Sequence, residues 1–392
     1  MFEARIGTPA LLLMAVASGL CVGGNYFNQP LLHSIALDLR VSESTASLTV
    51  TIAQLSYALG LLLLVPLGDM LERRGLAVGL MLLAALGQFT SGWAGGIVML
   101  CVGVGIAGLF SVAAQVLVPM AAALSDPARS GRAVGLVMSG LLTGILAARS
   151  VAGLLSDYGG WTTVYRVSGG LMLLVALVLW RVLPASRNPR RIAYGEVLGS
   201  MLTLLRRYPR LRSRSLLAGL SFASVSGMFA TMALLLSGPA HRLGDAAIGL
   251  IGLTGAAGAL TATLAGRWAD RGWLQVTTGA SVLLLALSFL PLWLGATSLP
   301  AFVLGFVVID AALQGIHISK QNVVYALLPE ARGRLNAVYM TAYFIGAALG
   351  SAAGSLAWQR AAWPGVCGLG LAMALGCALA WWWDLRLQRA GH

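Results

Sequence analysis

The sequence is poor in charged residues, and among those it has, acids and lysine are scarce. Only 10% of the 392 residues are charged, there are 13 acids, and Lys320 is the single lysine beside 25 arginines. Hydrophobic residues make up 58% of the chain, and the mean hydropathy is +0.84. A water-soluble domain of this length needs more polar surface than this composition provides. The composition therefore excludes an ordinary soluble enzyme or binding domain.

Signatures of the common enzyme classes are also missing from the sequence. All four cysteines fall in apolar runs without paired spacing, so we expect buried free thiols at Cys21, Cys101, Cys367 and Cys377. The four histidines show no metal-ligand spacing, and no GxxxxGK[ST] phosphate loop or nucleophile–base pairing is present. We therefore expect no metal, no cofactor, no ATP-driven step and no enzymatic activity.

The sequence contains many long apolar runs. Each is about 20 residues long or slightly more, which suits a helix crossing a hydrocarbon core of about 30 Å and is too strong a signal for a barrel strand. The first run is interpreted as a retained helix rather than a cleaved signal peptide, because many spans follow it. The predicted spans are residues 9–34, 45–67, 76–93, 97–124, 133–155, 164–183, 216–237, 247–264, 276–294, 301–328, 335–358 and 363–383. The predicted fold class is an all-α membrane protein with twelve transmembrane helices.

Arginine placement predicts the topology of these spans. A basic, proline-punctuated stretch at residues 184–214 separates an expected N-terminal bundle, 1–183, from an expected C-terminal bundle, 215–392. Twenty arginines lie on the side that carries both termini and this linker, and four lie on the other side. The positive-inside rule places the termini and the linker in the cytoplasm. The net charge of +13 is thus interpreted as a topology signal and a contact with membrane lipids, not with nucleic acid.

Motifs recur at an offset of about half the chain. Asp69 in "PLGDMLERRG" corresponds to Asp270 in "AGRWADRG", 201 residues later, and Gly144 corresponds to Gly346 at an offset of 202. A constant offset of this size indicates two six-helix bundles in the same orientation. Parallel repeats of this kind are typical of transporters that rock about a substrate site at the membrane midplane.

At these motifs the chain resembles the major facilitator superfamily. "GDMLERR" looks like the family's loop motif between helices 2 and 3, and "GRWADRG" looks like its echo between helices 8 and 9. Stretches such as "NYFNQPLL" and "GLLTGILAAR" are similar to a bacterial branch of drug and metabolite exporters. The resemblance implies two pseudo-symmetric bundles, a monomer, and a place in the bacterial inner membrane.

The resemblance also implies a latch that shuts the cytoplasmic side. Carried over to this chain, the gating motif consists of Gly68, Asp69, Arg73, Arg74, Gly266, Asp270 and Arg271. A carboxylate there can bond the N–H groups of a helix N-terminus, and the arginines can pair across the interface. Topology-setting charge alone is the alternative reading. The motif departs from the family pattern at Val65 and Met70, and helix 4 lacks the arginine that many antiporters carry. Export is therefore implied by the subgroup resemblance alone.

Polar residues in the predicted span 301–328 mark the expected transport site. Asp310 is the one acid that we place deep inside a span, and Arg149 and Lys320 are the corresponding cations. An ionised group at mid-bilayer costs about 2.5–3.5 kcal/mol, so such groups normally face the bundle interior or a watery cavity. At about 100° per residue, one face of this helix carries Asp310, Gln314, His317 and Gln321.

Several roles remain open for these residues. Asp310 is a proton carrier, a permanent ion-pair partner of Arg149, or an uncoupled part of the cavity wall. His317 relays protons or serves as a neutral hydrogen-bonding wall residue. Lys320 contacts an anionic substrate or, as we favour, extends to the cytoplasmic interface. The predicted proton-coupling group is Asp310, Arg149 and His317.

Polar pairs on other spans complete the set of candidates. The predicted substrate-binding residues are Asn25, Gln29, Gln54, Tyr57, Gln115, Gln314, Gln321 and Lys320. For Gln54 and Tyr57, hydrogen bonding between helices at the bundle interface is an equally good interpretation.

Together these patterns predict a secondary active transporter that exports small amphipathic molecules, drugs or metabolites, in exchange for protons by alternating access. An importer or facilitator of a small metabolite, with anions included, is the alternative. A non-transporting membrane sensor is a weaker alternative, because no segment resembles a signalling domain.

Overall fold

Most of the chain is helical in the part that the structure describes. The computed structural model covers residues 6–126, 129–186, 194–255, 273–328 and 332–390. Its first half contains α1 (Thr8–Gly23), η1 (Gly24–Tyr26), α2 (Asn28–Asp38), α3 (Glu43–Leu63), η2 (Val65–Asp69), α4 (Arg73–Gly92), α5 (Ile97–Phe110), α6 (Ala113–Ala123), α7 (Ser130–Gly159) and α8 (Trp161–Val182). Its second half contains α9 (Tyr194–Arg207), α10 (Pro209–Phe229), α11 (Met232–Ser237), α12 (Asp245–Ile251), η4 (Gly252–Gly255), α14 (Leu274–Leu294), α15 (Leu299–Leu327) and α16 (Arg332–Arg389).

Ten helical stretches among the described residues are long and apolar enough to cross a membrane. The last of them, Gly333–Arg389, contains two predicted spans, because Ala361 and Ala362 leave helical geometry and divide α16. α12 and η4 cover the start of the predicted span 247–264, and the rest of that span lies outside the described residues. The prediction of an all-α, multi-span membrane protein is confirmed.

Several predicted spans are broken near their middle. A 3-10 turn separates α1 from α2, and short irregular segments separate α5 from α6 and α10 from α11. Non-helical backbone at membrane depth is tolerated where protein or a cavity surrounds it. The break residues are accordingly buried, and they include Asn25, Tyr26, Ser111, Val112, Ala230 and Thr231.

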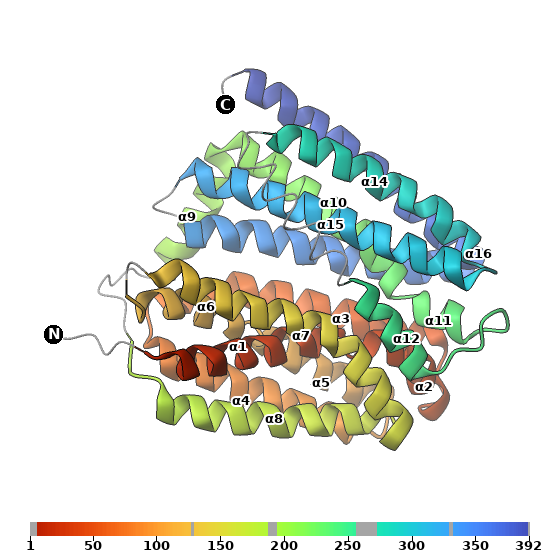
Figure 1. Cartoon of the computed structure of the whole chain (residues 1–392), viewed down its shortest axis with the longest axis horizontal. Coiled ribbons are helices and arrows are strands. Elements are labelled where there is room, and N and C mark those ends of the chain that lie inside the picture. Colours follow the sequence, from red (N-terminus) through yellow and green to blue (C-terminus); the bar gives the residue numbers. More distant parts are fainter. Residues whose placement is uncertain (1–5, 127–128, 187–193, 256–272, 329–331, 391–392) are drawn as a thin grey trace.

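The helices form two groups that lie side by side (Figure 1). α1 to α8 form the first group, in which α1 packs on α7 and α4 packs on α5 and α8. α10, α14, α15 and α16 form the core of the second group, where α10 packs on α16 and α14 on α15. Both termini and α9 lie at one end of the molecule, while α2, α11 and α12 lie at the other. The boundaries at residues 183 and 215 stay a prediction.

Glycine permits the closest helix contacts inside each group. A Cβ added to Gly144 would lie 2.3 Å from the Cα of Gly19, and one added to Gly346 would lie 2.4 Å from the Cα of Gly219. Any side chain there would push α1 from α7 or α10 from α16. Because Gly144 and Gly346 are 202 residues apart, the repeat in the sequence places the same contact in both groups.

The stretch predicted as a linker is partly helical, and one of its arginines is buried. α9 lies within residues 184–214, and α10 begins at Pro209, before the predicted start at residue 216. Arg214, predicted to lie in the linker, is fully buried in α10. This burial was not predicted, because the residue that neutralises the charge of Arg214 lies far along the sequence.

The neutralising residue is Asp384 of α16. Its carboxylate accepts a hydrogen bond from Arg214 Nη2, and both side chains are fully buried. Ser213 Oγ donates to Asp384 Oδ1 at 2.8 Å, and Gln275 Nε2 donates to Asp384 Oδ2 at 3.0 Å. Asp384 lies just past the end of the last predicted span, and its burial was not predicted from the sequence.

Replacing Asp384 with Asn is expected to destabilise the second group of helices. Loss of one partner leaves Arg214 buried without a counter-charge, which costs about 3–5 kcal/mol. Thermal unfolding of the purified protein in detergent should show a clear fall in Tm. The double variant Arg214→Leu/Asp384→Leu should recover most of that loss, and the exposed Arg386→Gln should be neutral. A double variant as unstable as Asp384→Asn would show that the pair is not what stabilises this region.

Candidate functional site

A cavity of about 230 Å³ lies between the two groups of helices. We call it the central cavity. It is lined by residues of η1, α3, α6 and α7 from the first group and of α10, α15 and α16 from the second. Its polar lining consists of Tyr26, Tyr57, Gln115, Arg149, Asp310, Gln314, His317, Asn336 and Tyr343. Six of the predicted site residues therefore meet here, namely Tyr57, Gln115, Arg149, Asp310, Gln314 and His317.

Arg149 is held in the cavity wall by neighbours other than Asp310. Its Nε donates to Gln29 Oε1 at 2.6 Å. Its guanidinium lies over the ring of Tyr26 at 5.0 Å and over that of Phe229 at 4.2 Å. Tyr26 belongs to the first group of helices and Phe229 to the second, so Arg149 bridges the two.

Asp310 has no ion-pair contact within 4.0 Å among the described residues. The positive charge of Arg149 nevertheless acts on it electrostatically within the shared cavity. The carboxylate also lies near η4, since a Cβ added to Gly255 would be 3.2 Å from Asp310 Oδ2. In this conformation the two side chains thus line one cavity without direct contact, and all three predicted roles of Asp310 stay predictions.

His317 lies on the same face of α15 as Asp310 and Gln314, two turns further along the helix. Its Nδ1 is 2.9 Å from the hydroxyl of Tyr339, and its ring is 5.2 Å from that of Tyr343. The imidazole therefore has a hydrogen-bond partner in α16 while it lines the cavity. Both its relay role and its role as a wall residue stay open.

An aromatic wall faces these polar groups, and the sequence analysis missed it. Phe222 stacks on Tyr343 with ring centroids 4.1 Å apart, and Tyr57 contacts Phe344 at 4.5 Å across the boundary between the groups. The signal that could have revealed part of this wall is the adjacent aromatic pair Tyr343 and Phe344 in α16. Ring-containing or aliphatic parts of a ligand can pack against such a wall.

Four predicted substrate residues are not among those that line the central cavity, namely Asn25, Gln29, Gln54 and Lys320. Gln54 Nε2 donates to Ser226 Oγ of the second group at 2.6 Å, which matches the interface interpretation of this residue. Asn25 Nδ2 donates to the carbonyl of Val22 at 3.4 Å. The side chain of Gln321 lies outside what the structure describes.

The side chain of Lys320 does not lie where the favoured interpretation places it. Its side chain is fully buried, and Nζ donates to Ser221 Oγ of α10 at 2.8 Å. It does not extend to the cytoplasmic interface, because its amino group binds a hydroxyl of the neighbouring helix inside the second group.

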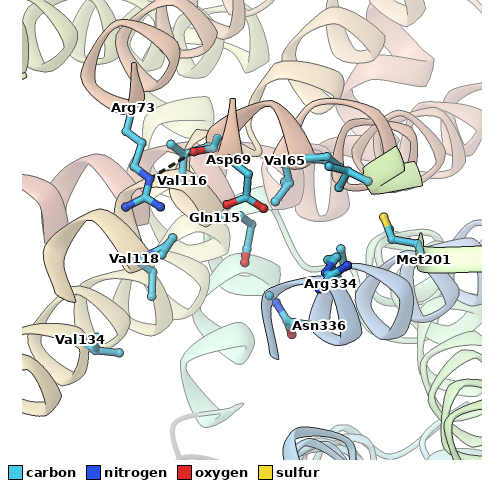
Figure 2. Close-up of a pocket in the computed structure, with 16 residues that line it drawn as sticks. Val65, Asp69, Arg73, Gln115, Val116, Val118, Val134, Met201, Arg334 and Asn336 are labelled. Carbon is cyan, nitrogen blue, oxygen red and sulfur yellow. Dashed lines mark hydrogen bonds between the residues drawn. The ribbon is translucent and has the colours of Figure 1, made fainter. Parts of the chain in front are cut away.

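A second hollow of about 440 Å³ adjoins the central cavity on the side of the molecule where the termini lie. We call it the vestibule. Gln115, Val118 and Asn336 line both spaces, so the two are neighbours. Figure 2 shows Asp69 on one wall of the vestibule and Arg334, from the first turn of α16, on the other.

The predicted gating residues of the first loop motif lie at this vestibule. Arg73 Nε donates to the carbonyl of Gly68 at 3.2 Å, within the motif itself. Arg74 Nη1 donates to the carbonyl of Leu183 at 3.1 Å, so this arginine contacts the first group in this conformation. The corresponding residues of the second motif, Gly266, Asp270 and Arg271, lie outside the described residues.

Glu72, which the sequence analysis did not single out, anchors this motif. Its carboxylate accepts hydrogen bonds from the backbone N–H groups of Arg74 at 2.8 Å, Gly75 at 2.7 Å and Ser186 at 2.9 Å. Burial alone would raise the pKa of Glu72, but these three donors and the Arg74 charge hold the pKa below its ordinary value. An ionised Glu72 thus caps α4 and ties it to the start of the linker.

The opposite side of the central cavity is closed by hydrogen bonds between the two groups. Asp245 of α12 accepts from Ser34 Oγ at 2.6 Å and from Ser156 Oγ at 2.7 Å. Ser150 Oγ donates to the carbonyl of Gly249 at 2.8 Å. We call this set of five residues the seal. The sequence analysis missed it because Asp245 lies outside the predicted spans.

The backbones of the two groups touch at the seal. A Cβ added to Gly153 would lie 2.3 Å from the carbonyl oxygen of Asp245, and one added to Gly249 would lie 2.4 Å from that of Arg149. The cavity is therefore shut by glycine-mediated contact on one side, while a hollow adjoins it on the other.

Comparison with known proteins agrees with this geometry. The model of the Major Facilitator Superfamily matches residues 14–280. The chain is 48% identical over 386 residues to YgaY, an uncharacterized transporter of Escherichia coli O157:H7, with 98% of each chain covered. It is 33% identical to a Streptomyces coelicolor protein named as a transporter, over 91% of this chain and 83% of that protein.

Solved structures show the same fold. The structure of a bacterial homolog of the human lysosomal transporter Spinster, in an inward-facing and occupied conformation, superposes with a TM-score of 0.72. It is 15% identical in sequence, with 97% of each chain covered. On the matched family model and these relatives, the chain belongs to the Major Facilitator Superfamily, whose members are non-enzymatic membrane carriers.

Proposed function

We propose that this transporter is a proton-coupled exporter of small amphipathic molecules that works by alternating access. The observation that carries the proposal is the central cavity, which is built from both groups of helices and holds Asp310, Arg149 and His317 on its wall. We expect the protein to act as a monomer in the bacterial inner membrane, with both termini and the linker in the cytoplasm.

The two ends of the cavity support alternating access. At one end the seal joins the groups through a few hydroxyl–carboxylate and hydroxyl–carbonyl bonds, which can break without leaving a large apolar interface exposed to water. At the other end the carboxylate of Asp69 faces the first turn of α16 across the vestibule. When the vestibule closes, that carboxylate can bond the N–H groups of the turn and attract Arg334.

The charges of the cavity support proton coupling. Arg149 is fixed by Gln29 and two aromatic rings, so its charge remains in the cavity whatever the state of Asp310. An ionised Asp310 is attracted to this charge across a space of low polarity, whereas a protonated Asp310 is not. Binding or release of one proton can therefore change the force between α7 and α15, which belong to different groups.

The lining of the cavity supports an amphipathic substrate. Aromatic rings from α3, α10 and α16 provide apolar contact area, and Gln115, Gln314 and Asn336 offer hydrogen-bond donors and acceptors. The same cavity contains Arg149, which favours the second candidate, an importer or facilitator of an anionic metabolite. Asp310 offsets this charge when it is ionised, so the exporter is the better supported of the two.

Transport in proteoliposomes tests the proposal. Candidate compounds, both amphipathic cations and anionic metabolites, are first screened by the rise in Tm of the purified protein. Compounds that bind are then assayed in vesicles with and without an imposed pH gradient. A proton-coupled exporter accumulates the compound against its own gradient only when the pH gradient is present. Simple equilibration would instead support the facilitator, and binding without transport would support a sensor.

A further inference from the structure

Arg149 and Asp310 both offer polar atoms to the central cavity. The guanidinium of Arg149 binds Gln29 through Nε, and its Nη1 and Nη2 make no hydrogen bond within the described residues. Asp310 is partly exposed in the cavity wall, and its carboxylate oxygens accept no hydrogen bond from the described part of the chain. Both sets of atoms are open to the cavity rather than enclosed by protein. A ligand in the cavity can therefore reach both residues.

A short 3-10 turn sets the separation between these two side chains. The stem of Arg149 lies against Gly252 of η4, since a Cβ added there would be 3.1 Å from Arg149 Cδ. Asp310 lies against Gly255, where an added Cβ would be 3.2 Å from Asp310 Oδ2. Positions i and i+3 of a 3-10 helix share one face and are about 6 Å apart along the helix axis. The two side chains thus lie along one turn of η4, near enough for one small molecule to bind both.

The surroundings of Arg149 suit a carboxylate. Gln29 Oε1 accepts from Nε at 2.6 Å, and the rings of Tyr26 and Phe229 lie over the guanidinium at 5.0 and 4.2 Å. The N–H groups of Nη1 and Nη2 remain as donors. A carboxylate can accept from two such groups side by side, and this pairing is stronger and more directional than a neutral hydrogen bond. Arg149 therefore favours a ligand with a carboxylate or an anion of similar shape.

Asp310 and the aromatic wall favour two further groups on the ligand. An ionised Asp310 attracts a cation, and an ammonium group has several N–H donors for the carboxylate oxygens. The rings of Phe222, Tyr343 and Phe344 offer apolar contact area in the same cavity. An ionised Asp310 repels a ligand that is only an anion, and Arg149 repels one that is only a cation. A molecule with both charges and an apolar side chain matches all three features.

We propose that the central cavity binds a small zwitterion with a carboxylate, an ammonium group and an apolar side chain, as apolar amino acids have. Its carboxylate pairs with Arg149, its ammonium pairs with Asp310, and its side chain packs on the aromatic wall. This inference rests on the proposed function, because it names the substrate class of the same cavity. A proton and the ammonium compete for the Asp310 carboxylate, so a ligand that binds to protonated Asp310 releases that proton to water. The ligand class therefore agrees with exchange against protons.

Binding to the purified protein in detergent tests the proposal without a membrane gradient. The three probes share a phenyl ring: phenylalanine carries both charges, phenethylamine lacks the carboxylate, and 3-phenylpropionate lacks the ammonium. Isothermal titration calorimetry on the wild type should show that phenylalanine binds about tenfold more tightly than either relative. Equal or tighter binding of a singly charged relative would overturn the proposal. Failure of phenylalanine, tryptophan and leucine alike to bind would also overturn it.

Two variants assign each charge of the ligand to its residue. Arg149→Gln should weaken phenylalanine binding by about tenfold and should not weaken phenethylamine binding. Asp310→Asn should weaken phenylalanine binding by a similar factor without abolishing it, since the amide oxygen still accepts a hydrogen bond, and should not weaken 3-phenylpropionate binding. The control Arg206→Gln, at an exposed position of α9, should leave all three affinities unchanged. Equal losses for all three probes in either cavity variant would contradict the assigned pairing.

Failure of this inference and failure of the proposed function give different results. Proton-coupled export is contradicted when a pH gradient does not drive accumulation in vesicles. The zwitterion site is contradicted when singly charged relatives bind as tightly as phenylalanine in detergent. A protein that prefers phenylalanine in detergent but only equilibrates it across vesicles would therefore support this inference and contradict proton coupling.

Discussion

Asp310→Asn is expected to reduce proton-driven accumulation of substrate by at least tenfold. Exchange of substrate between the two sides of the membrane should persist. An amide keeps the size and hydrogen-bonding capacity of the carboxyl group but cannot take up and release a proton. The expected loss is thus specific to coupling. It is measured in proteoliposomes, as accumulation under a pH gradient and as counterflow without one.

A matched control is available on the linker helix. Glu196 is an exposed acid of α9, and Glu196→Gln should leave both assays unchanged. If Asp310→Asn accumulates substrate as well as the wild type under the same pH gradient, Asp310 is not the proton carrier. A permanent ion pair with Arg149 would give a different pattern. Asp310→Asn alone would lower the Tm, and the double variant Asp310→Asn/Arg149→Gln would restore it.

Gly153→Leu is expected to reduce transport by at least tenfold, because the added side chain disrupts the seal. Any Cβ at this position meets the carbonyl oxygen of Asp245 at 2.3 Å, and that backbone cannot yield without separating α7 from α12. The two elements belong to different groups of helices, so each group can fold while their contact is lost. The protein should then shift toward a state that is open at the seal.

Spin labels on the seal side can measure this shift. Leu37→Cys and Thr297→Cys place labels on exposed positions of the two groups, in a background without the four native cysteines. Their separation should lengthen in Gly153→Leu. Gly170→Leu is the control, because a Cβ at the exposed Gly170 meets nothing within 4 Å. An unchanged separation in Gly153→Leu would contradict the assigned role of the seal.

Local patterns predicted the spans well. Whether a segment spans the membrane depends on the length and periodicity of its own apolar run, and these are properties of residues near one another in the sequence. The face of α15 that carries Asp310, Gln314 and His317 was predicted from spacing alone, and all three line the central cavity. The offset between Gly144 and Gly346 likewise predicted two equivalent helix contacts.

The partners of polar contacts over long sequence separations were not predicted. Gln54 bonds Ser226 across 172 residues, and Arg214 bonds Asp384 across 170. Lys320 was interpreted as reaching toward water, yet Ser221 binds it inside the second group. In each case the hydrogen-bond partner depends on which helices pack together and at what depth. The pattern of residues within one span contains no information about the packing of that span on others.

The amino-acid sequence by itself determined the class of this protein, the positions of most spans, the repeat and the polar face of α15. Those features follow from composition and periodicity, because each spanning helix must match the membrane through its own residues. Tertiary structure alone decided which charges are neutralised, where the two groups meet through Gly153 and Asp245, and which side of the cavity is closed. These depend on close approach between distant segments, because hydrogen bonds and steric contacts act over a few ångströms and helix packing sets those distances.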